Sequence, residues 1–377
     1  MSRLLLALFI LCTVPQSYGA ALPVPKAPEL AARSYLLADF QSGRILVEKN
    51  IDVRIEPASI TKIMTAYVIY QALERNLITR QDLVTVSEKA WKMQGSRMFL
   101  EVGKEVSVEN LLKGLIIQSG NDASVALAEH VAGSEESFVS MMNAEAERLG
   151  MTGTHYVNST GMPKSQHYTT AKDILMLTVA LIRDFPEEYK LYSQRSFVFN
   201  EITQSNRNRL LWLDKSVDGV KTGHTKSAGY CLAASATQGN MRLISVVLGA
   251  ANDKARSGHS RSLIKYGFRF FETHQLYRKA QKLSSARVWK GAESDVNLGL
   301  DQDLFVTYPR GQYEELTAQL DRPKVLQAPV VAGQKVGTVH ISLNNNSLLK
   351  APLVALNPVA EGGFVRRFVD NVLLMLE

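Results

Sequence analysis

The chain has 377 residues, of which 46% are hydrophobic and 21% are charged. These values are typical of globular proteins, and they exclude a disordered tail, a collagen-like fibre and a polytopic membrane protein. The length indicates two or three domains. The net charge of +7 is modest and Lys and Arg are scattered, which argues against a nucleic-acid-binding protein.

The first twenty residues have the pattern of a secretory signal peptide. Arg3 supplies a positive charge, residues 4–12 form an unbroken apolar run, and small residues follow, so we expect cleavage near Ala20 or Ala21. An uncleaved anchor helix is the alternative, but a bilayer span needs roughly 20 apolar residues. Cleavage leaves Cys231 as the only cysteine, so we expect a buried thiol and no internal disulfide.

The segment from residue 29 to residue 280 is predicted to fold as an antiparallel sheet covered by helices. A hairpin comes first, apolar helical segments follow, and three strands and an aromatic-rich helix come last, an order typical of α+β proteins. The predicted hairpin strands are 34–40 and 44–48, the helices start at Ser59 and cover 111–116, 123–131 and 261–273, and the later strands are 217–221, 229–237 and 241–249.

The composition changes near residue 280. Short alternating runs between residues 284 and 358, separated by Gly, Pro and Asn, predict a small all-β domain. The last segment, 360–377, has one apolar stripe at helical spacing from Phe364 to Leu376. It is too short to span a membrane, so we expect an amphipathic helix that lies in the membrane surface. A helix docked on its own protein is the alternative.

Ser59 and Lys62 stand three residues apart at a predicted helix start, so the hydroxyl and the amine lie on one face. An unprotonated lysine can take the serine proton and create a nucleophile. The lysine pKa starts near 10.4, so the site must lower it by desolvation or by neighbouring positive charge. The helix N-terminus also offers N–H groups to an oxyanion. This motif alone is weak, because Ser-x-x-Lys also begins at Ser262 and Ser347.

The order of three motifs is more specific than any one of them. Lys221-Thr222-Gly223 occurs once, on a predicted strand, and Ser119-x-Asn121 precedes it in a predicted inter-helix loop; only Ser59/Lys62 precedes both. The set resembles that of the penicillin-recognising serine acyltransferases. Within them the chain resembles the low-molecular-mass penicillin-binding proteins that are D-alanyl-D-alanine carboxypeptidases. The resemblance runs from about residue 34 to the C-terminus and implies a β-lactamase/transpeptidase-like domain.

The resemblance implies a role for each matched residue. Ser59 would be the acylated nucleophile and Lys62 its base, while Ser119 would relay a proton toward the leaving group and Asn121 would hold the substrate amide. A free carboxylate needs fixed positive donors, of which a bidentate arginine is the strongest. The further residues implied to bind substrate are Lys221, Thr222, Gly223, His224 (which supplies an oxyanion N–H), Arg256 and Arg207. Arg207 lies in a segment one residue shorter than the family pattern, and a solvated surface charge is the alternative for both arginines.

The implied function is a serine-type D-Ala-D-Ala carboxypeptidase that removes the terminal D-alanine from peptidoglycan stem pentapeptides through an acyl-enzyme. It implies no metal or other cofactor, covalent inhibition by β-lactams, and a place on the periplasmic face of the cytoplasmic membrane in peptidoglycan remodelling and cell-shape maintenance. A β-lactamase is one alternative, but the Glu-x-x-x-Asn segment of class A enzymes is missing from residues 122–220. A non-catalytic peptidoglycan-binding envelope protein and an enzyme that cleaves peptide cross-links are the others.

Overall fold

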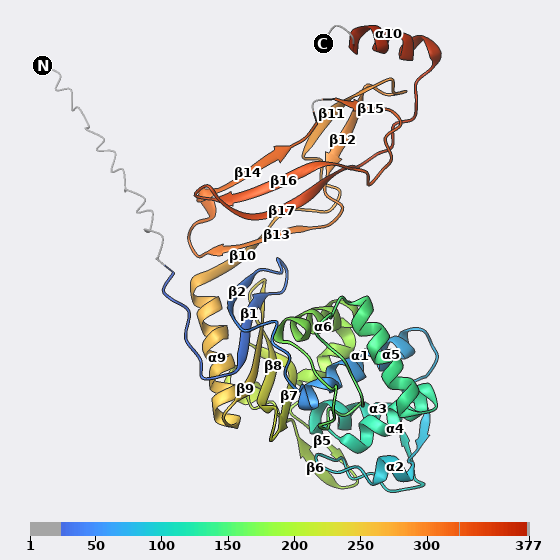
Figure 1. The fold of residues 1–377 in the computed structure, drawn as a ribbon, viewed down its shortest axis with the longest axis vertical. Coiled ribbons are helices and arrows are strands. Elements are labelled where there is room, and N and C mark those ends of the chain that lie inside the picture. Colours follow the sequence, from blue (N-terminus) through green and yellow to red (C-terminus); the bar gives the residue numbers. More distant parts are fainter. Residues whose placement is uncertain (1–23, 324, 375–377) are drawn as a thin grey trace, which may run out of the picture.

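The computed structural model describes residues 24–323 and 325–374. Figure 1 shows a helix-rich body built on one sheet, a β-rich body beyond it, and a short helix at the far end. The predicted signal peptide, residues 1–20, lies outside the described residues. Among the residues that are described, no helix is both long enough and apolar enough to cross a membrane.

A five-stranded antiparallel sheet, in the order β2-β1-β9-β8-β7, forms the centre of the helix-rich body. The predicted hairpin and the three later strands are confirmed, and the hairpin pairs with β9, about two hundred residues further along the chain. β7 is an edge strand, so one side of its backbone is available to other groups. The strands are β1 (Ser34–Asp39), β2 (Ile45–Lys49), β7 (Val217–Thr225), β8 (Gly229–Gln238) and β9 (Met241–Ala250).

Both faces of this sheet are buried, as the alternation along β1 shows. Leu36 and Ala38 pack into the large core beneath the helices before β7, whereas Leu37 packs on the other side against a later helix. The helical elements before β7 are η1 (Ala58–Thr61), α1 (Lys62–Glu74), α2 (Glu88–Trp91), α3 (Val108–Lys113), η2 (Gly114–Gln118), α4 (Asn121–Ala132), α5 (Glu135–Arg148), α6 (Ala171–Asp184), α7 (Pro186–Tyr189), η3 (Lys190–Ser193) and α8 (Leu210–Leu213).

Two short antiparallel ribbons lie among these helices. One pairs β3 (Leu83–Thr85) with β4 (Glu105–Ser107), and the other pairs β5 (Ser196–Phe199) with β6 (Ile202–Ser205). Figure 1 shows β5 and β6 close to β7, on the side where the sheet ends.

The helix that follows the sheet is α9 (Asp253–Phe270), and the predicted bounds of 261–273 were wrong at both ends. The side chain of Asn252 accepts a hydrogen bond from the Ala255 N–H and so caps the helix eight residues before its predicted start. The first two turns carry polar residues, so the apolar pattern did not reveal them. At the other end the chain turns directly into β10 (Phe271–Tyr277), which contains Thr273.

The β-rich body confirms the all-β expectation for the segment after residue 284. Its six-stranded sheet has the order β14-β16-β17-β12-β11-β15, and its core contains fully buried Val296, Leu298, Val339, Ile341 and Leu353. The strands of this sheet are β11 (Ser284–Trp289), β12 (Asp295–Gly299), β14 (Leu316–Asp321), β15 (Leu326–Gln327), β16 (Lys335–Leu343) and β17 (Asn346–Ala355). The body also contains β13 (Leu304–Pro309), which pairs with β10, and one 3₁₀ turn, η4 (Tyr313–Glu315).

The two bodies meet at a cluster of hydrogen bonds around Thr307. Its side chain lies 2.6 Å from Ser42 Oγ and 2.8 Å from Thr273 Oγ1, and its carbonyl accepts a 2.6 Å bond from Arg44. Thr273 also donates to Asp39, at the end of β1. In addition, β10 pairs with β13, so main-chain bonds cross the predicted junction at residues 280–284. The division of the chain at that junction stays a prediction.

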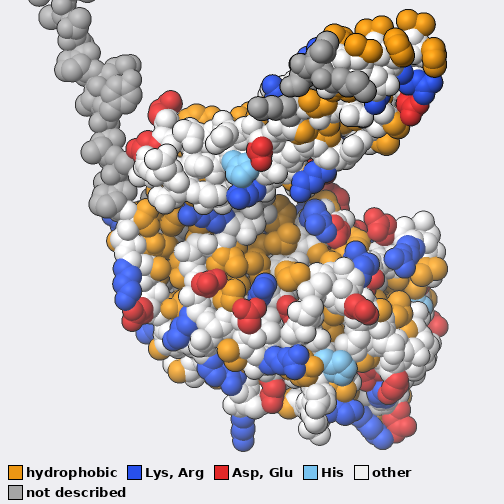
Figure 2. Space-filling view, turned by 45° about the horizontal axis from the view of Figure 1, so that its top comes forward, with side chains coloured by type: hydrophobic (Ala, Val, Ile, Leu, Met, Phe, Trp, Pro, Cys, Tyr) orange, Lys and Arg blue, Asp and Glu red, His pale blue; other side chains and the backbone are white. Residues whose placement is uncertain are grey.

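The terminal helix α10 (Phe364–Leu374) contacts the β-rich body through its polar side. Asp370 is buried, and its carboxylate accepts a 2.6 Å bond from the Lys290 N–H, while Arg367 pairs with Glu361. The apolar stripe points away: Phe364, Val365, Phe368, Val369, Val372 and Leu373 are each 40–77% exposed. Figure 2 shows these orange side chains gathered at the tip of the molecule. Leu376 lies outside the described residues.

Two glycines of α9 provide a matched test of how this helix packs on the sheet. A Cβ at Gly267 would lie 2.5 Å from Leu243 Cδ1 and 2.9 Å from Leu37 Cδ2, both fully buried side chains, whereas a Cβ at Gly258 would contact nothing. We therefore expect Gly267→Ala to lower the free energy of unfolding by about 1–3 kcal/mol through overpacking. Gly258→Ala should raise it by about 0.5–1 kcal/mol through helix propensity. Urea unfolding curves of both variants measure this, and equal effects would contradict the close approach.

Candidate active site

Ser59 and Lys62 lie on consecutive turns at the start of one helix. Ser59 belongs to η1 and is partly exposed, and Lys62 begins α1 and is 1% exposed. The distance between Ser59 Oγ and Lys62 Nζ is 3.1 Å. The predicted spacing therefore places an accessible hydroxyl directly beside a buried amine.

Two carbonyl oxygens fix the position of the Lys62 amine. Nζ donates a 2.6 Å bond to Asn121 Oδ1 and a 2.7 Å bond to the Thr160 carbonyl. A neutral amine has two N–H groups and one lone pair. If these two acceptors take both N–H groups, the lone pair is left to face Ser59 Oγ, which is the arrangement that a proton acceptor needs.

Burial also prepares Lys62 to be neutral. Desolvation lowers the pKa of Lys62 from 10.5 to about 7, although the negative charge of Asp122 opposes this and raises it. None of the ion pairs between described residues includes Lys62. A substantial fraction of this side chain is therefore uncharged at neutral pH, as the sequence analysis required of a base.

Ser119 and Lys221 form a second hydroxyl–amine pair in the same cluster. Ser119 follows the π-helical turn η2 with a left-handed backbone (φ 65°), and its Oγ accepts a 2.8 Å bond from Lys221 Nζ. Lys221 is 2% exposed, and desolvation followed by repulsion from Lys62 and Arg256 lowers its pKa well below 10.5. The pair connects the inter-helix loop to β7.

β7 can lie directly against η1 because residue 223 is a glycine. A Cβ at Gly223 would come within 3.0 Å of the Pro57 carbonyl and 3.1 Å of the Ile60 nitrogen, in the turn that carries Ser59. A side chain at this position would push the strand away from the nucleophile. Thr222 is buried beside it, and exposed His224 lies over the Tyr230 ring with 3.9 Å between ring centroids.

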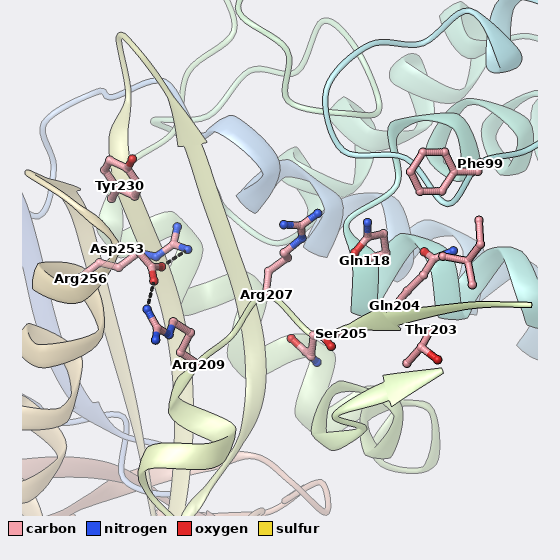
Figure 3. Close-up of a pocket in the computed structure, with 12 residues that line it drawn as sticks. Phe99, Gln118, Thr203, Gln204, Ser205, Arg207, Arg209, Tyr230, Asp253 and Arg256 are labelled. Atoms are coloured by element: carbon pink, nitrogen blue, oxygen red, sulfur yellow. Dashed lines mark hydrogen bonds and ion pairs between the residues drawn. The ribbon is translucent and has the colours of Figure 1, made fainter. Parts of the chain in front are cut away.

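A pocket of about 560 Å³ adjoins this cluster on the side of β5 and β6. Figure 3 shows Arg207 pointing into it between Gln118, which precedes Ser119, and the β7–β8 side. On the opposite wall Arg256 pairs with Asp253 at 2.6 Å, and Asp253 also pairs with Arg209 at 3.1 Å. Arg256 additionally donates to the Gly223 carbonyl, so it is tied to the Lys-Thr-Gly strand.

The structure thus brings all of the sequence-predicted residues to one region from five separate segments of the chain. Lys62 bonds to Ser59 and Asn121, and Ser119 and Lys221 form a second bonded pair. Arg256 is linked to Gly223, and Arg207 and Arg256 line the adjoining pocket. Asn121 contacts the Lys62 amine with its oxygen and donates to the Gln94 carbonyl with its nitrogen.

Two groups in this region were missed by sequence reasoning. The Thr160 carbonyl is a backbone atom, so no residue pattern could reveal it. Asp122 is buried next to Asn121, and its carboxylate accepts the N–H groups of Met98, Phe99 and Leu100. It fixes the loop that supplies Phe99 to the pocket. The only available signal was an acidic residue in the first turn of an apolar helix.

Two family models match this chain. Residues 22–252 match the model described as D-alanyl-D-alanine carboxypeptidase, and residues 271–361 match the model described as penicillin-binding protein 5, C-terminal domain. Together they cover most of both bodies, and α9 (Asp253–Phe270) lies between the two matched ranges.

The chain is similar to curated enzymes over nearly its full length. It is 47% identical to D-alanyl-D-alanine carboxypeptidase DacC of Escherichia coli, over 97% of this chain and 93% of that protein. It is 43% identical to D-alanyl-D-alanine carboxypeptidase DacA of the same organism, over 93% and 89%.

Solved structures share the fold. Penicillin-binding protein 5 from Haemophilus influenzae superposes with a TM-score of 0.87 and 42% identity, over 89% of this chain and 100% of that one. Penicillin-binding protein D2 from Listeria monocytogenes, in its ampicillin-bound form, superposes with a TM-score of 0.60 and 27% identity, over 65% of this chain and 100% of that one.

Proposed function

This chain belongs to the D-alanyl-D-alanine carboxypeptidase family of serine peptidases, and we propose that it removes the terminal D-alanine from peptidoglycan stem pentapeptides with Ser59 as nucleophile and Lys62 as base. One observation carries the assignment of these two roles. The buried Lys62 amine is held by two carbonyl oxygens and lies 3.1 Å from the Ser59 hydroxyl.

Acylation follows from this geometry. The Ser59 hydroxyl proton passes to neutral Lys62 as Oγ attacks the carbonyl carbon of the penultimate D-alanine. The N–H groups of Ser59 and His224 stabilise the oxyanion of the tetrahedral intermediate. The C–N bond then breaks as the proton held by Lys62 passes by way of the Ser119–Lys221 pair to the departing amine, so that Lys62 is neutral again and D-alanine leaves. Water attacks the remaining ester, which releases the shortened peptide and restores the Ser59 hydroxyl.

The terminal carboxylate of the substrate is proposed to lie against the Lys-Thr-Gly strand. Lys221, Thr222 and Arg256 are close together there, and the mutual repulsion of buried Lys221 with Arg256 favours an anion between them. Arg207 points into the same pocket and would add positive charge. Binding of the substrate amide by Asn121 stays a prediction.

Penicillins would acylate the same serine. Their strained lactam carbonyl takes the place of the scissile peptide, and the leaving amine stays tethered to the acyl group, so hydrolysis of that ester is slow. The β-lactam carboxylate would use the same donors as the peptide carboxylate.

The exposed stripe of α10 is proposed to bind the membrane surface. Its polar side contacts Lys290 and Glu361, and its apolar side chains stay 40–77% exposed. An amphipathic helix in this orientation buries its apolar face among lipid acyl chains. In this proposal the enzyme would lie peripherally on the periplasmic face of the cytoplasmic membrane, where it would act in peptidoglycan remodelling and the maintenance of cell shape.

The assignment of Ser59 and Lys62 is tested by acylation with a fluorescent penicillin and by release of D-alanine from a diacetylated Lys-D-Ala-D-Ala peptide. Ser59→Ala should abolish both, because the nucleophile is lost. Lys62→Ala should slow acylation by about 10² to 10⁴, the usual value of a positioned proton transfer. A covalent mass shift on the Ser59→Ala protein after penicillin treatment would show that Ser59 is not the nucleophile.

The acylation rate should also depend on pH in a defined direction. Since burial lowers the pKa of Lys62 to about 7, protonation below that pH removes the base. The second-order rate constant should therefore rise about tenfold per pH unit below 7 and level off above it. A profile that is flat between pH 5 and pH 9 would mean that another group accepts the proton.

The role of Arg256 is tested by two substrates against two enzymes. Arg256→Leu should lower kcat/KM for a D-Ala-D-Ala peptide by an amount that corresponds to a few kcal/mol of transition-state stabilisation. The loss should be much smaller for the analogue with an amidated terminus. Arg209→Leu is the matched control, because it also removes a guanidinium from Asp253 but lies at the exposed rim. If Arg256→Leu weakens both substrates equally, Arg256 has only a structural role.

Membrane association is tested by deleting residues from Phe364 onward. The deletion should release the protein from vesicles and leave hydrolysis of soluble peptides unchanged. Each apolar side chain buried in the membrane contributes about 1.5 kcal/mol to the binding free energy before ordering costs. Membrane binding should therefore depend more on apolar burial than on charge. High salt should accordingly leave the full-length protein bound, and release by a salt wash would contradict this account.

A further inference from the structure

A buried histidine ties the segment that contains Thr160 to the turn that contains the nucleophile. His167 is 3% exposed; its Nε2 lies 2.9 Å from Thr61 Oγ1, and its Nδ1 accepts a 3.1 Å bond from the Val157 N–H. We propose that His167 is a positioning residue that holds the Thr160 carbonyl against the Lys62 amine, which rests on the proposed role of Lys62 as base.

The contacts of His167 fix its tautomer. The Val157 N–H is a donor, so Nδ1 must present a lone pair and the ring proton must be on Nε2. Nε2–H then donates to Thr61 Oγ1, in the residue directly before Lys62. Burial lowers the pKa of His167 to about 4, so the neutral ring persists at neutral pH. The imidazole is therefore a fixed connector with one acceptor and one donor.

The segment that His167 holds bonds to two helices around the amine. The Thr160 carbonyl accepts from Lys62 Nζ at 2.7 Å. The neighbouring Ser159 carbonyl accepts from Thr65 on α1 at 2.6 Å and from Ser124 on α4 at 2.8 Å. Without His167 the segment that contains Thr160 loses its hydrogen bond to Thr61, and water can reach the Lys62 amine.

Hydration of the amine has a predictable electrostatic result. Desolvation is the main cause of the low pKa of Lys62, and Asp122 on α4 is the charged group that acts against it. Lys221 on β7 is the other buried charged group nearby, and repulsion from Lys62 lowers the pKa of Lys221. Neither is altered by a change at His167. The titratable neighbour of His167 itself is His155, which is exposed. Opening the segment should therefore raise the pKa of Lys62 toward 10.5 and make the base less available at neutral pH.

The test is the pH profile of acylation by a fluorescent penicillin, measured from pH 5 to pH 10 on the full-length protein. His167→Phe should slow acylation at pH 7 by about tenfold or more and move the midpoint of the acid limb up by about one pH unit or more, with the rate recovering at high pH. His167→Gln retains a donor and an acceptor, so the midpoint of its acid limb should lie between those of the wild-type protein and His167→Phe. His155→Asn, in the same segment but on the surface, should keep the wild-type profile.

Thr61→Val provides an independent route to the same result. It keeps the side-chain shape but removes the acceptor of the His167 Nε2–H, so its midpoint should also rise. It replaces His167→Phe if thermal melting shows that the latter does not fold. An unchanged midpoint in the folded variants overturns the proposal, whether or not the rate falls, because a purely structural role lowers the rate equally at every pH. Failure of the proposed function looks different, since the wild-type protein would then not be labelled at Ser59.

Discussion

A lysine amine that is buried beside a serine hydroxyl, and whose pKa burial lowers to about 7, is the constraint on which the rest of this structure depends. Lys62 is 1% exposed, and two carbonyl oxygens rather than a carboxylate contact its nitrogen. A carboxylate in contact would stabilise the ammonium and remove the base. Carbonyl acceptors instead orient the neutral amine, and Asp122, the nearby acid, is engaged by three backbone N–H groups of the 98–100 loop.

This constraint explains why the site is assembled from distant segments. Asn121 begins α4, Thr160 belongs to the segment before α6, and Lys221 lies on the edge strand β7. Each reaches the cluster because α1 is packed in the centre of the helix-rich body, between the sheet and the other helices. Gly223 lets β7 approach the nucleophile turn without a side chain between them. Burial and repulsion from Lys62 also lower the pKa of Lys221, the second buried lysine of the site.

The β-rich body separates the helix-rich body from α10 and its exposed apolar stripe. Hydrogen bonds around Thr307 and the β10–β13 pairing fix the β-rich body against the end of the central sheet. At the other end, Asp370 holds the polar side of α10 on Lys290, so the apolar side points outward. Figure 1 shows α10 at the end of the molecule opposite α1, the helix that begins with Lys62.

The sequence by itself determined the local features of this protein. Short-range periodicity predicted the hairpin, the three later strands and the amphipathic terminal helix. Residue type and motif order predicted the site residues Ser59, Lys62, Ser119, Asn121 and Lys221. Only the tertiary structure revealed the Thr160 carbonyl, the buried carboxylate of Asp122 and the link from His167 to Thr61. These contacts join residues through backbone atoms or across long separations, and they depend on which polar groups lose water together. Which groups lose water together is a property of packing, and no local sequence pattern encodes it. The start of α9 was missed because its first turns are polar and its cap is Asn252, so the apolar pattern did not include them.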